Sequence, residues 1–283
     1  MSRDSPQSSP EQPFFFQLGP DQLFAMLHVP GSGRPRRGVV FCHALAEEKL
    51  WSHRVFVTLA REWAQQGMAV LRFDCRGEGD SDLEFEQAGI GSRVDDAVRA
   101  AEVLLEHLPE LGGLTFLGHR LGAAVAAAAA ARLQERARGL IVWDPVQNGR
   151  EYLMQLLRSN LANQMTVQGS VTRTREALVK ALDAGELVHV DGYGIGTALY
   201  RDLTALDWGR LLGALACPAL VIQVEKSSGG GAHAAPETPL TRNHKLQYAS
   251  AREPAFWRES RELHRRAPNM AALSLQWLVE SAS

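Results

Sequence analysis

Short apolar runs alternate with longer segments of helical periodicity over the first half of the chain. Runs with the length of buried strands occur at residues 39–42, 68–73, 114–117 and 139–143. Between them, segments 52–66 and 93–108 carry apolar residues at three- and four-residue spacing, which predicts amphipathic helices. This alternation is typical of a mostly parallel, doubly wound sheet with helices on both faces.

Further apolar runs complete the predicted sheet at about eight strands. Runs 14–18 and 23–29 flank Gly19-Pro20-Asp21-Gln22, a composition typical of a hairpin turn, so they predict an antiparallel start. Runs 218–224 and 246–249 predict the last two strands. A closing helix is expected at 270–279.

Two regions depart from this pattern. Between 146 and 212, helical periodicity at 152–162 gives way to polar, glycine-bearing sequence. We interpret this region as an inserted helical cap over the carboxyl ends of the strands, where ligands bind in such sheets. The core would then consist of residues 14–145 and 213–283. The first thirteen residues are rich in Ser, Pro and Gln and are expected to form a disordered tail.

The sequence Gly118-His119-Arg120-Leu121-Gly122 separates a predicted strand from an Ala-rich helix at 123–138. A buried strand, a tight Gly-x-x-x-Gly corner and a helix form the nucleophile elbow of α/β-hydrolases. A Cβ at either flanking glycine is expected to collide with the neighbouring strand or helix. The apex, which holds serine in the hydrolase pattern, is Arg120. A guanidinium can bind and polarise an anion, but it cannot attack a carbonyl.

Candidate pocket residues follow the carboxyl ends of the predicted strands. In hydrolases the segment corresponding to His43-Ala44-Leu45 supplies an oxyanion-hole N–H, so Leu45 and Leu121 are the expected donors. His43 is expected at the pocket floor, where it could bind substrate or bond the backbone. The full expected pocket comprises His43, Leu45, Glu47, Glu48, Arg120, Leu121, Asp144 and Glu225.

Arg120 needs a counter-charge, because an unpaired buried guanidinium would be very costly. Glu47, Glu48, Asp144 and Glu225 are predicted on loops at the same sheet edge, and we expect at least one to pair with it. The ion pair could simply plug a vestigial pocket. Alternatively, Arg120 and the two N–H groups could bind a carboxylate, a phosphate or a sugar acid.

The histidine of a catalytic triad is missing from its usual place. Glu225 and Asp144 could each be the acid, but residues 250–257 after the last predicted strand contain no histidine. His244 precedes that strand, and His264 is expected beyond it on a helix. His119 is expected to point away from the pocket. We therefore assign no catalytic residue.

The corner Asp74-Cys75-Arg76-Gly77-Glu78-Gly79-Asp80-Ser81 follows another predicted strand. Its glycines and its Asp and Arg side chains are expected to build the turn by bonding backbone or each other. Ser81 or Asp80 could instead be catalytic. Ser81 and Cys42 are the candidate nucleophiles if the protein is an active hydrolase.

Composition narrows the possible partners. A formal charge of −2 and a pI near 6.5 give no support for binding nucleic acid. The three cysteines, Cys42, Cys75 and Cys217, have no metal-type spacing and fit buried thiols in a reducing cytoplasm. We therefore expect no metal, no cofactor and a cytoplasmic location. No apolar run has the length of a membrane span.

Taken together, residues 43–49, the corner 74–81, the Arg-bearing elbow and Pro254-Ala255-Phe256-Trp257 resemble the exosortase A system-associated hydrolases, type two. That resemblance implies an α/β-hydrolase fold and a cytoplasmic accessory role near exopolysaccharide and protein-sorting functions. It does not imply a substrate.

Three hypotheses follow. The first is an α/β-hydrolase-fold protein without serine-hydrolase chemistry that binds a small anionic, acyl or sugar ligand or acts as an accessory protein. The second is an active ester, thioester or peptide hydrolase with a non-standard nucleophile. The third is a purely structural partner of another protein.

Overall fold

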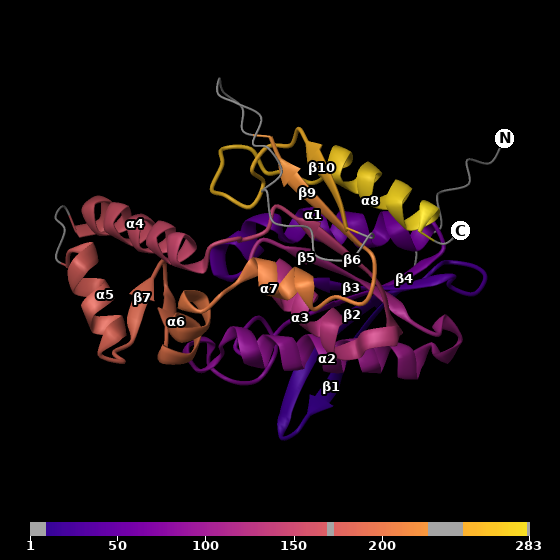
Figure 1. Ribbon diagram of the computed structural model, residues 1–283, viewed down its shortest axis with the longest axis horizontal. Helices are drawn as coiled ribbons and strands as arrows, with labels where there is room; N and C mark the ends of the chain where they lie inside the picture. Colours follow the sequence, from indigo (N-terminus) through magenta and orange to yellow (C-terminus); the bar gives the residue numbers. More distant parts are fainter. Residues whose placement is uncertain (1–9, 169–172, 226–245, 282–283) are drawn as a thin grey trace.

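The structure is a computed structural model that describes residues 10–168, 173–225 and 246–281 (Figure 1). Its centre is one eight-stranded sheet. In spatial order the strands are β1 (Glu11–Leu18), β2 (Asp21–His28), β4 (Met68–Phe73), β3 (Arg37–Cys42), β5 (Leu114–His119), β6 (Ala137–Trp143), β9 (Ala219–Val224) and β10 (Leu246–Ala251). β2 pairs antiparallel with β1 and β4, and the remaining pairs are parallel. The predicted sheet is confirmed.

Helices cover both faces of this sheet. The alternation within β3 shows the two layers, because Val39 and Phe41 belong to one buried cluster and Val40 and Cys42 to the other. The first cluster includes residues of α1 (Ala46–Gln65) and α8 (Pro268–Glu280). The second includes residues of α2 (Ile90–His107) and α3 (Gly122–Leu133). Short 3-10 segments are η1 (Phe85–Gln87), η2 (Pro109–Leu111) and η3 (Gln134–Arg136).

Several predicted boundaries are wrong. α1 begins at Ala46, six residues before the predicted start, so Glu47 and Glu48 lie in its first turn and not on a loop. Apolar periodicity could not reveal this turn, which is polar; acidic residues there are stabilised by the helix dipole. β1 begins at Glu11, so residues 11–13 of the predicted tail belong to the sheet. The Ala-rich helix ends at Leu133 and not at 138.

The inserted region contains more than helices. It comprises α4 (Gly149–Gln168), α5 (Arg175–Asp183), β7 (Val188–Val190), β8 (Tyr193–Ile195), α6 (Thr197–Thr204) and α7 (Trp208–Gly213). β7 and β8 form a hairpin in the stretch that the sequence indicated only as polar and glycine-bearing. Asp191 and Gly192 both have positive φ, 50° and 87°, as a type I′ hairpin turn requires. Figure 1 shows α4, α5, α6 and β7 grouped at one end of the core, whereas α7 packs against α3.

The cap contacts the core at close range. A Cβ on Gly196, the N-cap residue of α6, would lie 2.0 Å from the carbonyl oxygen of Glu86 in η1. A Cβ on Gly89, just before α2, would lie 2.5 Å from the carboxylate of Asp202 in α6. The same carboxylate accepts a hydrogen bond of 3.0 Å from the Gly91 N–H. At Gly196, where the contact is with backbone, the cap is therefore fitted to the core without room for an extra methyl group.

Within the described residues, no helix combines the length and apolar character needed to cross a membrane.

We expect Gly196→Ala to lower the free energy of unfolding by roughly 1–3 kcal/mol, because the added methyl must push η1 and α6 apart. Urea denaturation measures this change. Gly31→Ala is the control, since no atom lies within 4 Å of its added Cβ, and it should stay within about 0.5 kcal/mol of the wild type. Equal effects of the two substitutions would contradict the close contact between cap and core.

Candidate functional site

The elbow between β5 and α3 has the backbone that its glycines permit. Arg120 has φ 53°, in the left-handed region, and its N–H donates to the Trp143 carbonyl at 3.0 Å. A Cβ on Gly118 would lie 2.6 Å from the Ala123 Cα, and one on Gly122 would lie 2.2 Å from the His43 carbonyl oxygen. The expected need for glycine at both flanks is confirmed.

Arg120 is held between two carboxylates. Its Nε donates to Glu48 Oε1 at 3.0 Å, and its Nη1 donates to both the side-chain Oδ2 and the carbonyl oxygen of Asp144, each at 3.0 Å. Arg120 as a whole residue is only 9% exposed to solvent. The expectation that Arg120 pairs with at least one acid at this edge is confirmed, and it has two such partners.

The two segments that supply the partners of Arg120 also have strained backbone. Ala46 and Asp144 also have positive φ, 52° and 43°, although neither is glycine. Such conformations cost energy and persist where the surrounding structure determines them. Asp144 is further fixed because its Oδ1 accepts from the Val224 N–H at 3.3 Å. The conformation of Asp144 presents both its carboxylate and its carbonyl oxygen to Arg120.

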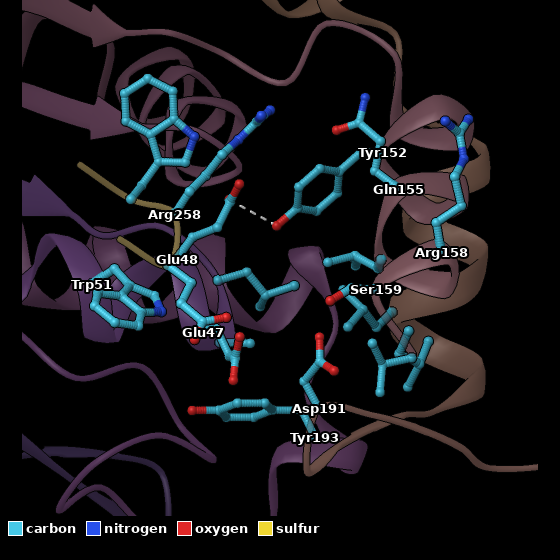
Figure 2. A pocket seen from close by; sticks show the side chains of 18 of the residues that line it. Glu47, Glu48, Trp51, Tyr152, Gln155, Arg158, Ser159, Asp191, Tyr193 and Arg258 are labelled. Atoms are coloured by element: carbon cyan, nitrogen blue, oxygen red, sulfur yellow. Dashed lines mark hydrogen bonds between the residues drawn. The ribbon is translucent and has the colours of Figure 1, made fainter. Parts of the chain in front are cut away.

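Tyr152 of α4 connects the cap to the Arg120–Glu48 ion pair. Its hydroxyl donates to Glu48 Oε2 at 2.9 Å, a bond drawn in Figure 2. Burial raises the pKa of the Glu48 carboxyl above its usual value, although Arg120 and the Tyr152 hydroxyl act in the opposite direction. Sequence reasoning missed Tyr152, because nothing in helical periodicity identifies which cap residue reaches the elbow.

Aromatic residues occupy the region where hydrolases place the triad histidine, after the last strand. The Arg120 Cζ lies 5.3 Å from the centroid of the Trp257 ring and 5.9 Å from that of Tyr152, within cation–π range. His264 lies in the segment before α8, so its predicted helical position is wrong. His244 lies outside the described residues.

His119 lies on the α1/α8 side of β5 with Leu117 and does not line the cavity described below, in agreement with the prediction that it points away from the pocket. Its ring stacks on Phe256 at 5.2 Å and an interplanar angle of 15°, and the Phe56 ring is 5.4 Å away. His43 packs edge-on against Phe56 at 5.0 Å. Within the described part of the chain, neither His119 ring nitrogen nor the His43 Nδ1 has a hydrogen-bond partner. Burial lowers the pKa of both imidazoles well below 6.5.

A cavity of about 590 Å³ separates the core from the cap. Leu45, Glu47 and Glu48 line it as predicted, and Figure 2 shows the two glutamates on one side with Tyr152 opposite. The sequence did not reveal the aromatic residues of its wall, which are Trp51, Phe85, Tyr152, Tyr193 and Trp257.

The remaining expected pocket residues do not line this cavity. His43, Arg120, Leu121 and Asp144 are absent from its wall. Glu225 lies at the end of β9, exposed, and its Oε2 accepts from Arg252 Nε at 2.7 Å. Placement at the same sheet edge was therefore not enough to bring Glu225 to Arg120. Of the two candidate triad acids, Asp144 is the one that reaches the elbow.

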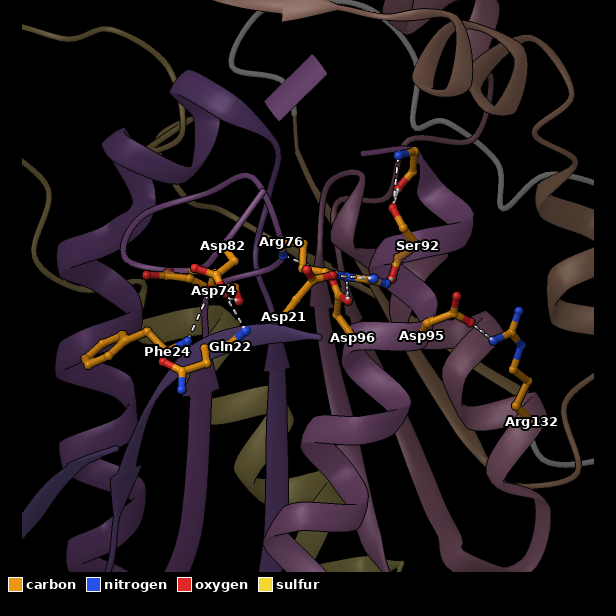
Figure 3. A network of polar contacts seen from close by, with 12 residues as sticks. Asp21, Gln22, Phe24, Asp74, Arg76, Asp82, Ser92, Asp95, Asp96 and Arg132 are labelled. Atoms are coloured by element: carbon orange, nitrogen blue, oxygen red, sulfur yellow. Dashed lines mark hydrogen bonds and ion pairs between the residues drawn. The ribbon is translucent and has the colours of Figure 1, made fainter. Parts of the chain in front are cut away.

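The corner after β4 has a structural role (Figure 3). The Ser81 hydroxyl donates to the Asp74 carbonyl at 2.7 Å and accepts from the Phe24 N–H at 2.9 Å. Arg76 does not bond Asp74; its Nε donates to Asp96 Oδ1 at 2.7 Å. Asp74 instead accepts from Lys49 Nζ at 2.7 Å. These bonds favour the turn-building interpretation over a catalytic Ser81.

Strand order, the elbow and the cap define an α/β-hydrolase fold. The chain belongs to the family described as "Serine aminopeptidase, S33", whose pattern matches residues 33–226.

The relatives are partial or distant. Protein phosphatase methylesterase 1 of Cryptococcus neoformans is 33% identical over 118 residues, which are 38% of this chain and 28% of that protein. The chain thus spans less than a third of that relative. Est1E of Butyrivibrio proteoclasticus with bound ferulic acid has a TM-score of 0.67 at 15% identity, covering 95% of this chain and 99% of that one. An alpha-beta serine hydrolase homologue from Coxiella burnetii has a TM-score of 0.55 at 16% identity, covering 94% and 97%. The two structural likenesses show the fold alone.

We expect Arg120→Met to destabilise the protein by roughly 3–5 kcal/mol, because it leaves the buried Glu48 carboxylate without its cation. Adding Glu48→Leu should recover part of that loss, and the double-mutant cycle measures the coupling by urea denaturation. Arg252→Met is the matched control. Its pair with Glu225 is exposed, so the loss of stability should be much smaller than that caused by Arg120→Met. Additive effects at Arg120 and Glu48 would contradict the ion pair.

The buried imidazoles predict acid sensitivity. Because the folded pKa of His119 lies below its unfolded value near 6.5, the unfolded state binds more protons, and stability falls as pH drops below 6.5. His119→Phe keeps the ring stack and removes the titration. The loss of stability between about pH 7.5 and about pH 5.5 should therefore be smaller in this variant. The control is His189→Gln, which replaces an exposed histidine. This variant should lose as much stability over the same pH range as the wild type. If the stability of His119→Phe depends on pH as that of the wild type does, the buried His119 imidazole is not a source of the acid sensitivity.

Proposed function

We propose that this protein binds a small organic ligand in the cavity between core and cap and does not carry out serine-hydrolase chemistry. One observation carries the proposal: Arg120 occupies the nucleophile position and is bonded to Glu48 and Asp144. A guanidinium engaged in this way offers no electron pair for attack on an acyl group.

The surroundings of Arg120 support the same conclusion. An acyl-transfer site needs an imidazole within bonding reach of the nucleophile. Trp257 approaches the elbow from the segment that would supply this imidazole. Among the hydrogen bonds of the described residues, none joins a serine hydroxyl to a histidine ring.

The competing proposal is an active carboxylic-ester, thioester or peptide hydrolase with a nucleophile from elsewhere. Family membership and the likeness to a methylesterase favour it. Its two candidate nucleophiles fit poorly. The Ser81 hydroxyl is bonded to backbone on both sides, and burial raises the pKa of the Cys42 thiol well above 9, which disfavours the reactive thiolate.

An accessory role in a cytoplasmic exosortase-type or exopolysaccharide system is a further part of the proposal. It is supported by the sequence resemblance at the elbow and at residues 43–49 and 254–257. Such a role is compatible with a ligand cavity, because ligand binding can regulate a partner without any catalysis.

A fluorophosphonate probe tests the absence of serine chemistry. We expect no stoichiometric labelling of the wild type, and none of Arg120→Ser, since a serine placed at the apex would face Trp257 without a base. An active serine hydrolase labelled in the same reaction is the positive control. Labelling of a single serine in the wild type, abolished by Ser81→Ala, would establish the competing proposal.

A further inference from the structure

The cavity presents a carboxylate, and not the elbow guanidinium, at its inner end. Glu48 lines the cavity, whereas Arg120 is buried and contacts Glu48 from outside the cavity wall. The positive charge of Arg120 is matched by Glu48 and by Asp144. A molecule in the cavity therefore contacts the Glu48 carboxylate and not the Arg120 guanidinium.

Glu48 is fixed in place and can still accept hydrogen bonds. Arg120 donates to one of its carboxylate oxygens and the Tyr152 hydroxyl to the other. Each carboxylate oxygen has two lone pairs, so an acceptor position remains on both. The Glu48 side chain keeps 15% of its surface exposed. It is thus a preoriented acceptor, held by the core on one side and by the cap on the other.

The remaining cavity wall suits an apolar body. Side chains from η1, α4, β7, β8 and α6 contribute Phe85, Leu156, Val190, Tyr193, Ile195 and Leu199. Trp51 and Trp257 add aromatic surface from the core side. Ligand cavities of this size bind drug-sized molecules mainly through such surfaces, with a few polar groups that fix orientation.

The charge balance of the wall disfavours an anion. Four carboxylates and two guanidinium groups line the cavity. Near its mouth, burial raises the pKa of the Glu47 carboxyl, and the neighbouring carboxylates Asp191 and Glu259 raise it further. An entering carboxylate or phosphate would experience the same repulsion.

The geometry points to an amphipathic ligand whose hydrogen-bond donor, an ammonium or a hydroxyl group, meets Glu48 while its aliphatic or aromatic body lies against the cap. This inference rests on the proposed function and specifies its ligand class. It reverses the polarity suggested by the sequence, in which Arg120 and the Leu45 and Leu121 N–H groups would receive an anion.

Three probes with one carbon skeleton test the polarity: phenylbutylamine, phenylbutanol and phenylbutyrate. Their binding to the full-length protein can be followed by calorimetry and by intrinsic tryptophan fluorescence, to which Trp51 and Trp257 in the cavity wall contribute. We expect the amine or the alcohol to bind at least about tenfold more tightly than the acid. Comparison of the amine with the alcohol shows whether charge or hydrogen bonding dominates.

Substitutions of Glu48 should change this order. Glu48→Ala uncovers the Arg120 guanidinium, so the acid should bind more tightly than the amine in that variant. Glu48→Gln keeps the side-chain shape if the alanine variant folds poorly, and it should reduce the discrimination to less than about threefold. Glu151→Gln is the matched control, because Glu151 lies beside Tyr152 on α4 but does not line the cavity. It should leave the order unchanged.

Three results would overturn the inference: tighter binding of the acid by the wild type, binding of none of the probes up to the millimolar range, or an unchanged order in both Glu48 variants. These outcomes are separate from failure of the proposed function, which would appear as fluorophosphonate labelling of the wild type whatever the probes do.

Discussion

The interaction between the Arg120 guanidinium and the Glu48 and Asp144 carboxylates determines what this fold can do. The elbow places a permanently charged side chain at the start of α3, where the helix dipole disfavours a cation, and 9% of the residue is exposed. Only direct pairing makes such a position tolerable. Both partners come from other sheet-edge segments, the first turn of α1 and the turn after β6, so the elbow joins three parts of the core.

The same cluster also joins the core to the cap. Tyr152 reaches Glu48 from α4, and Trp257 covers the guanidinium from the segment after β10. The tight contacts of Gly89 and Gly196 fix the cap independently. The cavity is therefore formed before any ligand arrives, which reduces the ordering cost of binding. The cavity presents a negative group because Glu48, and not Arg120, is the residue of the ion pair that lines it.

Most of the sheet could be predicted from the sequence, because buried parallel strands are continuous apolar runs and the elbow glycines mark their own corner. The pairing of Arg120 could be predicted from the cost of an unpaired charge. The identity of the acids that pair with Arg120 could not be predicted. The sequence places Asp144 and Glu225 at one edge of the sheet but does not give the direction of their side chains. The first turn of α1 is polar, so its helical state left no periodic signal, and the contribution of Tyr152 depends on how the cap packs.

The most direct test is a high-resolution crystal structure of the elbow region. We predict the Arg120 guanidinium within hydrogen-bond distance of both Glu48 and Asp144, with the Trp257 ring over it and the Glu48 carboxylate facing the cavity. This prediction would be contradicted by an Arg120 side chain turned away from both carboxylates, with a serine or cysteine within bonding reach of an imidazole beneath the cap.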